Sequence, residues 1–410
     1  MTGDRSEPAR LDGRALRGGD AEVYRELRRV YGPVAPVLLE GDVPVWLVLG
    51  YREVQYVAAH PELFGRDPLR WNAWDRVPRD WPMLPFVSRT ASVLFTEGEE
   101  HRRRAGAISD VLAGCDPLGV RLDAERTADA AVDRFAGAGR AELIREYADP
   151  VPRRVVARLL ALDEAETLDL ERDLAASLGD DPQQAAAGRA RVHGAMELLL
   201  ERAARQPGGD LASRLLAHPA RLTPDEAAED LVALFTVGVL PTADWIGNTL
   251  RLMLTDDRFA VSLSGGRRSV GQALTEVLWT RPPMQNVLGR WAVHDTQLGG
   301  RRIRRGDCLV LGLAAANADP QVCPYAPEAG TGALAAAGGG NQAHLAFSHG
   351  EHRCPAPAAE LAEVIATAAV EVLLDRLPDL ALAPARLAPP PALPVHFTPL
   401  AEPPAGARRA

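Results

Sequence analysis

The sequence contains no lysine, so arginine supplies all 46 of its basic residues, against 55 acidic ones, for a formal net charge of −9. A negative balance favours solubility and argues against a general nucleic-acid binder. Aromatic residues make up only 5% of the chain, so leucine, alanine and valine must fill most of the core. No stretch reaches about 18 uncharged apolar residues, and the polar first twenty residues do not resemble a signal peptide. We therefore expect a cytoplasmic protein without a membrane segment.

Cysteine is also scarce, and the four cysteines form no CxxC pair: Cys115, Cys308, Cys323 and Cys354. This scatter argues against a disulfide framework in so large a chain.

The hydrophobic pattern predicts a mainly α protein with small β-sheets, organised as a single large domain over residues 1–410. Residues 34–50 alternate around Glu40-Gly41-Asp42 and predict a β-hairpin. Residues 222–254 predict a long central helix, with Thr223 as cap and Pro224 in its first turn. Pro241 lies near the middle of this segment and predicts a kink, because proline removes a backbone hydrogen bond. Further segments predict helices at 51–59, through most of 99–280 and at 358–377, and strands within 288–313.

Residues 65–95 predict a long irregular loop that carries Trp71, Trp74 and Trp81. Long loops with large apolar rings often serve function. Packing of these rings on the core is an equally good interpretation, and the sequence leaves both open.

One short segment, FSHGEHRCPAP at 347–357, places Cys354 directly before a predicted helix. The helix N-terminus favours a thiolate there. Four interpretations compete: a buried structural cysteine, a catalytic nucleophile paired with a histidine, an axial thiolate on haem iron, and a zinc site. The zinc ligands would be His344, His349, His352 and Cys354.

The same segment resembles the cytochrome P450 signature F-G-x-G-x-H-x-C-x-G. Phe347, Gly350, His352 and Cys354 match in place, whereas Ser348 and Ala356 replace two glycines. The resemblance extends over almost the whole chain. It includes GEEHRRR at 98–104, GVLPTADWIGN at 238–248, and the run LGRWAVHDTQLGGRRIRRGDCLVLGLAAANADP.

This resemblance implies a cytochrome P450 fold with b-type haem (iron protoporphyrin IX) held through Cys354, the proximal metal ligand. It implies that Phe347 packs against the ligand loop and shields the sulfur. The haem propionates would be bound by His101, Arg290 and His352. In the central helix, the family's oxygen-activation segment falls on Gly238, Pro241 and Thr242.

Three departures from the family pattern stand out. Glu276 occupies the first position of the ExxR motif, but Trp279 replaces its arginine, and Glu328 falls near the expected partner arginine. Loss of both arginines favours a rebuilt contact that Trp279 fills, in a chain that still folds and binds haem.

The second departure concerns the acid and alcohol of the central helix, which are Leu240 and Pro241 here. Neither side chain donates a proton. In the third, Ala105 replaces an arginine expected to bind a propionate. Two alternatives follow: Arg103 or Arg104 compensates, or one propionate loses a partner. Arg102, Arg103 and Arg104 have two further interpretations: they are solvated surface charges, or they form a basic patch that binds an acidic ferredoxin.

The activity implied is monooxygenation of a small organic substrate with O2. Electrons would come from NAD(P)H through a ferredoxin reductase and a ferredoxin. Leu240 and Pro241 leave two alternatives: a peroxide-driven or otherwise non-standard haem-thiolate enzyme, and a haem-binding accessory or sensor protein with little turnover.

Overall fold

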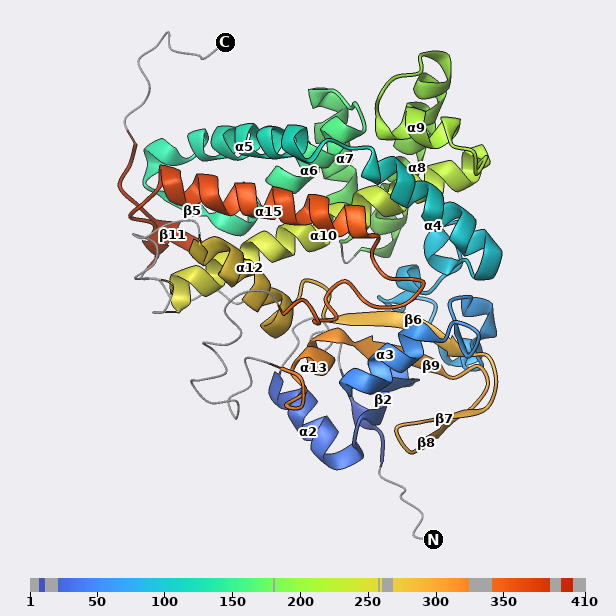
Figure 1. Cartoon of the computed structure of the whole chain (residues 1–410). Coiled ribbons are helices and arrows are strands. Elements are labelled where there is room, and N and C mark those ends of the chain that lie inside the picture. The colour runs from blue at the N-terminus through green and yellow to red at the C-terminus, as the bar shows by residue number, and fades with distance from the viewer. Residues whose placement is uncertain are drawn as a thin grey trace. The chain divides into compact units, whose positions relative to one another are not determined.

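The computed structural model describes residues 7–11, 21–179, 181–256, 259, 268–323, 341–383 and 392–400. Helices dominate it, as predicted (Figure 1). The chain separates into two compact units: residues 1–113, 169–234 and 278–356 form unit 1, and residues 114–168, 235–277 and 357–410 form unit 2. Each unit is described by itself, and organisation as one domain stays a prediction.

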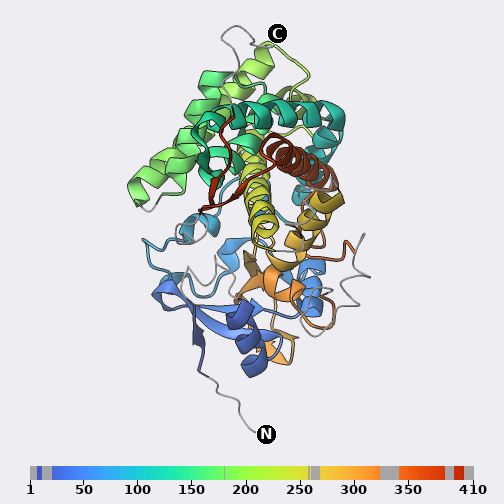
Figure 2. The same ribbon diagram turned by 90° about the vertical axis from the view of Figure 1, so that its left-hand side faces the viewer.

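Unit 1 is built on a six-stranded sheet with the order β1-β2-β3-β9-β6-β4. Its strands are β1 (Ala9–Arg10), β2 (Val34–Leu39), β3 (Val43–Val48), β4 (Phe64–Gly65), β6 (Asn286–Ala292) and β9 (Cys308–Gly312). A two-stranded sheet joins β7 (Thr296–Leu298) to β8 (Arg301–Ile303). Figure 2 shows strands from the N-terminal part of the chain (blue) beside strands from its later part (orange).

The predicted hairpin at 34–50 is confirmed. Strands β2 and β3 pair antiparallel with Val34 opposite Val48. The turn between them contains Gly41 at φ 78°, a left-handed conformation that glycine adopts without steric cost.

Alternating side chains of β9 pack on opposite faces of this sheet. Cys308 and Val310 belong to one buried cluster, and Leu309 and Leu311 to another. The first cluster also contains Trp71, Trp81 and Trp291, with Trp74 packed against it. The structure therefore favours the core interpretation of the tryptophan loop over a substrate-covering one.

The helices of unit 1 include α2 (Ala21–Tyr31), α3 (Tyr51–Ala59), α4 (Gly98–Ala113), α8 (Pro182–Arg205), α9 (Leu211–Ala217) and α13 (Leu313–Asn317), and α7 (Glu164–Ser177) crosses the division between the units. Unit 2 contains α5 (Pro117–Asp133), the short π-helix η7 (Ile144–Ala148), α6 (Pro150–Leu159), most of α12 (Arg268–Thr280), and α15, which starts at the division (Ala356–Arg376). Its sheet has the order β10-β11-β5, formed by Ala381–Leu382, Pro394–His396 and Arg140–Glu142.

Helices α5 and α15 lie side by side in unit 2 (Figure 1). Arg121 of α5 pairs with Glu371 of α15 at 2.6 Å, and Arg376 of α15 pairs with Asp133 of α5 at 2.7 Å. Such partly exposed pairs fix the register of the two helices more than they add stability.

The predicted central helix is α10 (Pro224–Thr255). Its start is a capping box: the Glu226 amide donates to Thr223 Oγ1 at 3.2 Å, and the Thr223 amide donates to the Glu226 carboxylate at 2.9 Å. The helix continues through Pro241. By length and composition it is the one helix in the described residues that could cross a membrane, but more than half of its most apolar window is buried, as in a core helix.

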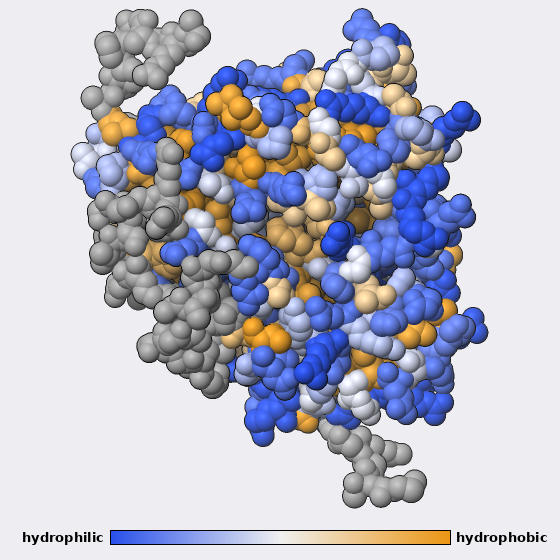
Figure 3. All heavy atoms as spheres, viewed as in Figure 1, coloured by the Kyte–Doolittle hydropathy of each residue, from blue (hydrophilic) through white to orange (hydrophobic). Residues whose placement is uncertain are grey.

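On the face drawn in Figure 3, hydrophilic side chains predominate and apolar ones are scattered among them. The most exposed large apolar side chains come from different elements: Leu69, Leu118 and Leu198.

Candidate functional site

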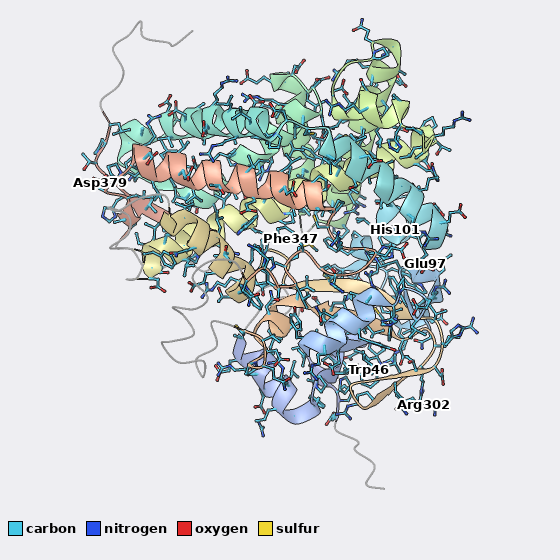
Figure 4. The ribbon with its side chains drawn as sticks, viewed as in Figure 1. Trp46, Glu97, His101, Arg302, Phe347 and Asp379 are labelled. Carbon is cyan, nitrogen blue, oxygen red and sulfur yellow. The ribbon has the colours of Figure 1, made fainter. Side chains whose placement is uncertain are left out.

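The thiolate loop, residues 347–357, is closed by backbone hydrogen bonds and leads into α15. The Cys354 amide donates to the Phe347 carbonyl at 2.9 Å, and the Ser348 amide donates to the Leu345 carbonyl at 2.8 Å. Figure 4 places Phe347 on this loop. The two ends of the loop are thus tied together next to the sulfur.

Two residues of the thiolate loop have a left-handed backbone, Ser348 at φ 64° and Gly350 at φ 72°. A Cβ atom on Gly350 would lie 2.0 Å from the carbonyl oxygen of Ala58 in α3. Because that obstacle is backbone, it cannot rotate away, and the loop can approach α3 only with glycine at this position.

Cys354 is half-buried, and burial raises the pKa of its thiol to about 11. The N-terminus of α15 begins two residues later and does not offset this effect. The protein alone therefore keeps the thiol protonated at neutral pH, which argues against a nucleophilic cysteine. A cation at the sulfur would supply the missing stabilisation of the thiolate.

His101, His352 and Arg290 lie close together in unit 1. The rings of His101 and His352 are 3.8 Å apart. Burial, reinforced by the positive charges of Arg290 and His101, lowers the pKa of His352 strongly, and burial likewise holds the pKa of Arg290 well below its usual value. Three side chains that can carry positive charge are thus buried in one cluster.

The side-chain atoms of this group are not all satisfied. Among the described residues, Arg290 Nη1 and His352 Nε2 are buried without a hydrogen-bond partner. His101 Nε2 lies 3.3 Å from the Glu351 carbonyl oxygen. Figure 4 shows His101 on α4, close to Glu97. Buried donors without partners cost free energy, so this arrangement fits an anionic ligand that would pair with them.

Arg66 fixes the backbone next to Arg290, a contact that was not predicted from the sequence. Strand β6 has a register shift between Leu288 and Arg290, and Gly289 at the shift has φ 101°. The Arg66 guanidinium donates to the Gly289 carbonyl at 2.5 Å and to the Leu94 carbonyl at 2.9 Å. Its partners lie 28 and more than 200 residues away in the chain, so no local pattern could have revealed the contact.

The zinc interpretation is not supported. In the part of the chain that the structure describes, no three His, Cys, Asp or Glu side chains lie close enough to hold a metal ion together. The segment that carries His344, His349, His352 and Cys354 is within that part.

No family model matches the chain. The cytochrome P450 monooxygenase PikC of Streptomyces venezuelae is 29% identical over 368 residues, 86% of this chain and 83% of PikC. The vitamin D(3) 25-hydroxylase of Pseudonocardia autotrophica is 28% identical over 87% of this chain and 86% of its own. Among solved structures, CYP154C4 from Streptomyces sp. ATCC 11861 has 26% identity and a TM-score of 0.81, with 95% of this chain and 99% of that one covered.

The chain belongs to the cytochrome P450 family. The predicted fold class is confirmed, and the chain is an enzyme of the monooxygenase class to which these relatives belong. Haem is the cofactor of a cytochrome P450. The residues present fit it: Cys354 offers one soft ligand, and the unpaired donors of Arg290 and His352 match the two propionates.

Of the two alternatives at Ala105, the structure argues against compensation by Arg103 or Arg104. Arg104 is buried against Asp230, with its Nε 3.0 Å from Asp230 Oδ2, and Arg103 pairs with Glu226. Neither guanidinium is available to a propionate, because each already neutralises a carboxylate. Only Arg102 of the run is strongly exposed, and it lies 3.2 Å from Glu351. Two of the three arginines that could have formed a basic patch for a ferredoxin are therefore already paired with carboxylates.

The ExxR position holds a buried ring, as expected. Trp279 is 1% exposed at the end of α12, and Glu276 is also buried. The expected counterpart Glu328 lies outside the described residues.

In α10, Thr242 Oγ1 donates to the Gly238 carbonyl at 2.7 Å, so its hydrogen atom is used within the helix. A Cβ atom on Gly238 would meet no heavy atom within 4 Å, so there is open space beside this turn. Pro241 has no N–H to donate, and Leu240 presents no polar atom. The structure reveals no donor at either of these two positions.

Proposed function

We propose that the chain is a cytoplasmic haem-thiolate monooxygenase that inserts one oxygen atom from O2 into a small organic substrate. Electrons would come from NAD(P)H through a ferredoxin reductase and a ferredoxin. The observation that carries the proposal is the pair of buried unpaired donors, Arg290 Nη1 and His352 Nε2. His352 packs against the ring of His101 and precedes Cys354 by two residues.

In this proposal Cys354 holds the iron, and Phe347 packs beside the sulfur. His101, Arg290 and His352 bind the propionates. The two carboxylates of the haem neutralise this buried basic cluster, which among the described residues has no acidic partner of its own at the unpaired atoms. Haem bound in this way supplies the site for binding and activating O2. Gly238, Pro241 and Thr242 form the turn of α10 proposed to face that chemistry.

We propose Asp244 as the proton source that replaces the missing acid. It lies four residues after Leu240, hence on the same side of α10. Desolvation, together with the charge of Asp149, raises the pKa of Asp244 to about 6. Asp149 itself pairs with Arg153 at 3.1 Å. A carboxyl group with a pKa near neutrality can both donate and recover a proton.

The substrate class is proposed from the relatives. The relatives include a mycinamicin IV hydroxylase/epoxidase of Micromonospora griseorubida and the vitamin D(3) 25-hydroxylase, so mycinamicin IV and vitamin D(3) are the first compounds to screen. Spectral shifts on titration with each compound would identify binders before any turnover is measured.

The test combines haem binding with turnover. The reduced CO complex of the purified protein should show the red-shifted Soret band of thiolate ligation, and Cys354→Ala should abolish it. Product should form with NADPH, ferredoxin and its reductase. A purified protein that binds no haem, or whose Cys354→Ala variant keeps the thiolate band, would refute the proposal.

The same reactions test the proton source. Asp244→Asn should lower the ratio of product to NADPH consumed and raise peroxide release, whereas Asp225→Asn in the first turn of α10 should change neither. Equal ratios in both variants would exclude Asp244 as the donor.

A peroxide-driven enzyme is the second candidate, favoured by Leu240 and Pro241, which cannot donate protons. Peroxide delivers oxygen already reduced, so a relay is not needed. Product formed with peroxide but not with the ferredoxin system would select this candidate. A protein that binds haem but forms no product under either condition would instead fit an accessory or sensor role.

A further inference from the structure

The end of α12 and the segment that leads into the thiolate loop are tied together by two connections, one partly buried and one fully buried. Trp279 Nε1 donates to the Asn341 carbonyl at 3.0 Å. Asn317, fully buried, donates to the Leu278 carbonyl at 2.8 Å and accepts from the Leu345 amide at 2.7 Å. Residues 278–279 are therefore fixed against residues 341–345 by direct hydrogen bonds.

Aromatic contacts continue from Trp279 into the thiolate loop. The rings of Trp279 and His344 meet edge to face, with centroids 6.0 Å apart and planes at 88°. The rings of His344 and Phe347 are 5.9 Å apart at 52°. Both distances lie in the range at which aromatic rings attract each other. We name Trp279, His344 and Phe347 the aromatic series.

The aromatic series ends at the ligand cysteine. The carbonyl of Phe347 accepts the hydrogen bond from the Cys354 amide, so the backbone of Phe347 and the backbone of Cys354 move together. A displacement of the Trp279 ring would displace the packed rings of His344 and Phe347, and with them the sulfur of Cys354.

We propose that Trp279 is a positioning residue for the Cys354 thiolate. The aromatic series and the Trp279–Asn341 hydrogen bond hold the thiolate loop in its ligating geometry, at the position where the family pattern has an arginine. This inference rests on the proposed binding of haem by Cys354.

The experiment compares Trp279→Phe, which keeps a ring but loses the N–H, with Trp279→Leu, which loses both. Trp46→Phe is the matched control, because Trp46 Nε1 also donates a single hydrogen bond, to Asp307 at 2.9 Å, and Trp46 is not part of the aromatic series. For each variant, three quantities are measured: the haem dissociation constant, the thiolate-ligated fraction of the reduced CO complex, and hydrogen exchange of residues 341–356 without haem.

Trp279→Phe should increase conversion from the thiolate-ligated to the thiol form by about two- to tenfold, the worth of one hydrogen bond, and Trp279→Leu by about tenfold or more. Exchange at Leu345, Ser348 and Cys354 should accelerate in the same order. Trp46→Phe should leave all three quantities at their wild-type values.

If Trp279→Leu lowers the melting temperature as a core substitution would, yet keeps the thiolate fraction and the exchange of residues 341–356 unchanged, the proposal is wrong. If no variant and not even the wild type binds haem, the proposed function fails. Exchange in the haem-free chain then decides the role of Trp279 by itself, with unchanged exchange counting against it.

Discussion

His344 gives the chain a specific sensitivity to acid. It is buried between Trp279 and Phe347, and burial lowers its pKa from 6.5 to about 4. In the unfolded chain the imidazole titrates at its ordinary value. Because the unfolded state binds the proton more tightly, stability is full above pH 6.5 and falls as the pH drops from 6.5 towards 4.

The magnitude follows from the two pKa values. One pKa unit corresponds to about 1.36 kcal/mol, so the 2.5 units between 6.5 and about 4 set a limit of about 3.4 kcal/mol. At about pH 5 the folded state should have lost about 2 kcal/mol of stability to this group, relative to about pH 8.

The assay is urea unfolding of the wild type and of His344→Phe at both pH values. Phenylalanine keeps a ring between Trp279 and Phe347 but cannot titrate. The other titrating groups are common to both proteins, so they cancel in the difference between the two free energies of unfolding. That difference should shift by about 2 kcal/mol in favour of His344→Phe on acidification. A difference that stays constant would show that His344 is not buried in its neutral form.

Three further predictions test other parts of the structure. Gly350→Ala should destabilise the protein by more than about 3 kcal/mol or prevent folding, because its Cβ would meet the Ala58 backbone. Gly106→Ala, whose Cβ would meet no heavy atom within 4 Å, should stabilise α4 by about 0.5 to 1 kcal/mol. Thermal denaturation of both variants measures the two effects. Ser348→Gly should raise the free energy of unfolding by about 0.5 to 1 kcal/mol by removing the left-handed strain at φ 64°, and a decrease would contradict the backbone assignment. Arg104→Met should cost about 3 to 5 kcal/mol, because it leaves Asp230 charged and buried, and Arg104→Met with Asp230→Asn should recover part of the loss without changing the haem content of the folded protein.

The elements that the sequence predicted well are those set by local pattern. The hairpin at 34–50 and the helices α10 and α15 follow from alternation, helical periodicity and end signals within a few residues. The thiolate loop was identified by its motif, and the resemblance correctly brought His101 and His352 together.

The contacts that the sequence did not predict join residues far apart in the chain. Arg104 looked like part of an exposed arginine run, yet its partner Asp230 is 126 residues away and both are buried. The tryptophans of 65–95 could have covered a substrate or packed on the core, and only the sheet, completed by β6 and β9, decides for the core. Charge and ring content are visible in a sequence, but the partner that determines what they do is not.

The departures from the family pattern divide into two kinds. At Trp279 the lost arginine is replaced by contacts that can be named: one hydrogen bond to Asn341 and an edge-to-face ring on His344. At Leu240 and Pro241 no donor occupies the original positions: the Thr242 hydroxyl donates to its own helix, and the proposed substitute, Asp244, lies one helical turn further along α10. Cofactor binding should therefore be robust, whereas the yield of product per electron should be the property that these substitutions have changed. The two properties are measured separately, by haem retention and by coupling, so a chain that binds haem tightly but couples poorly is the outcome that the residues of this structure lead us to expect.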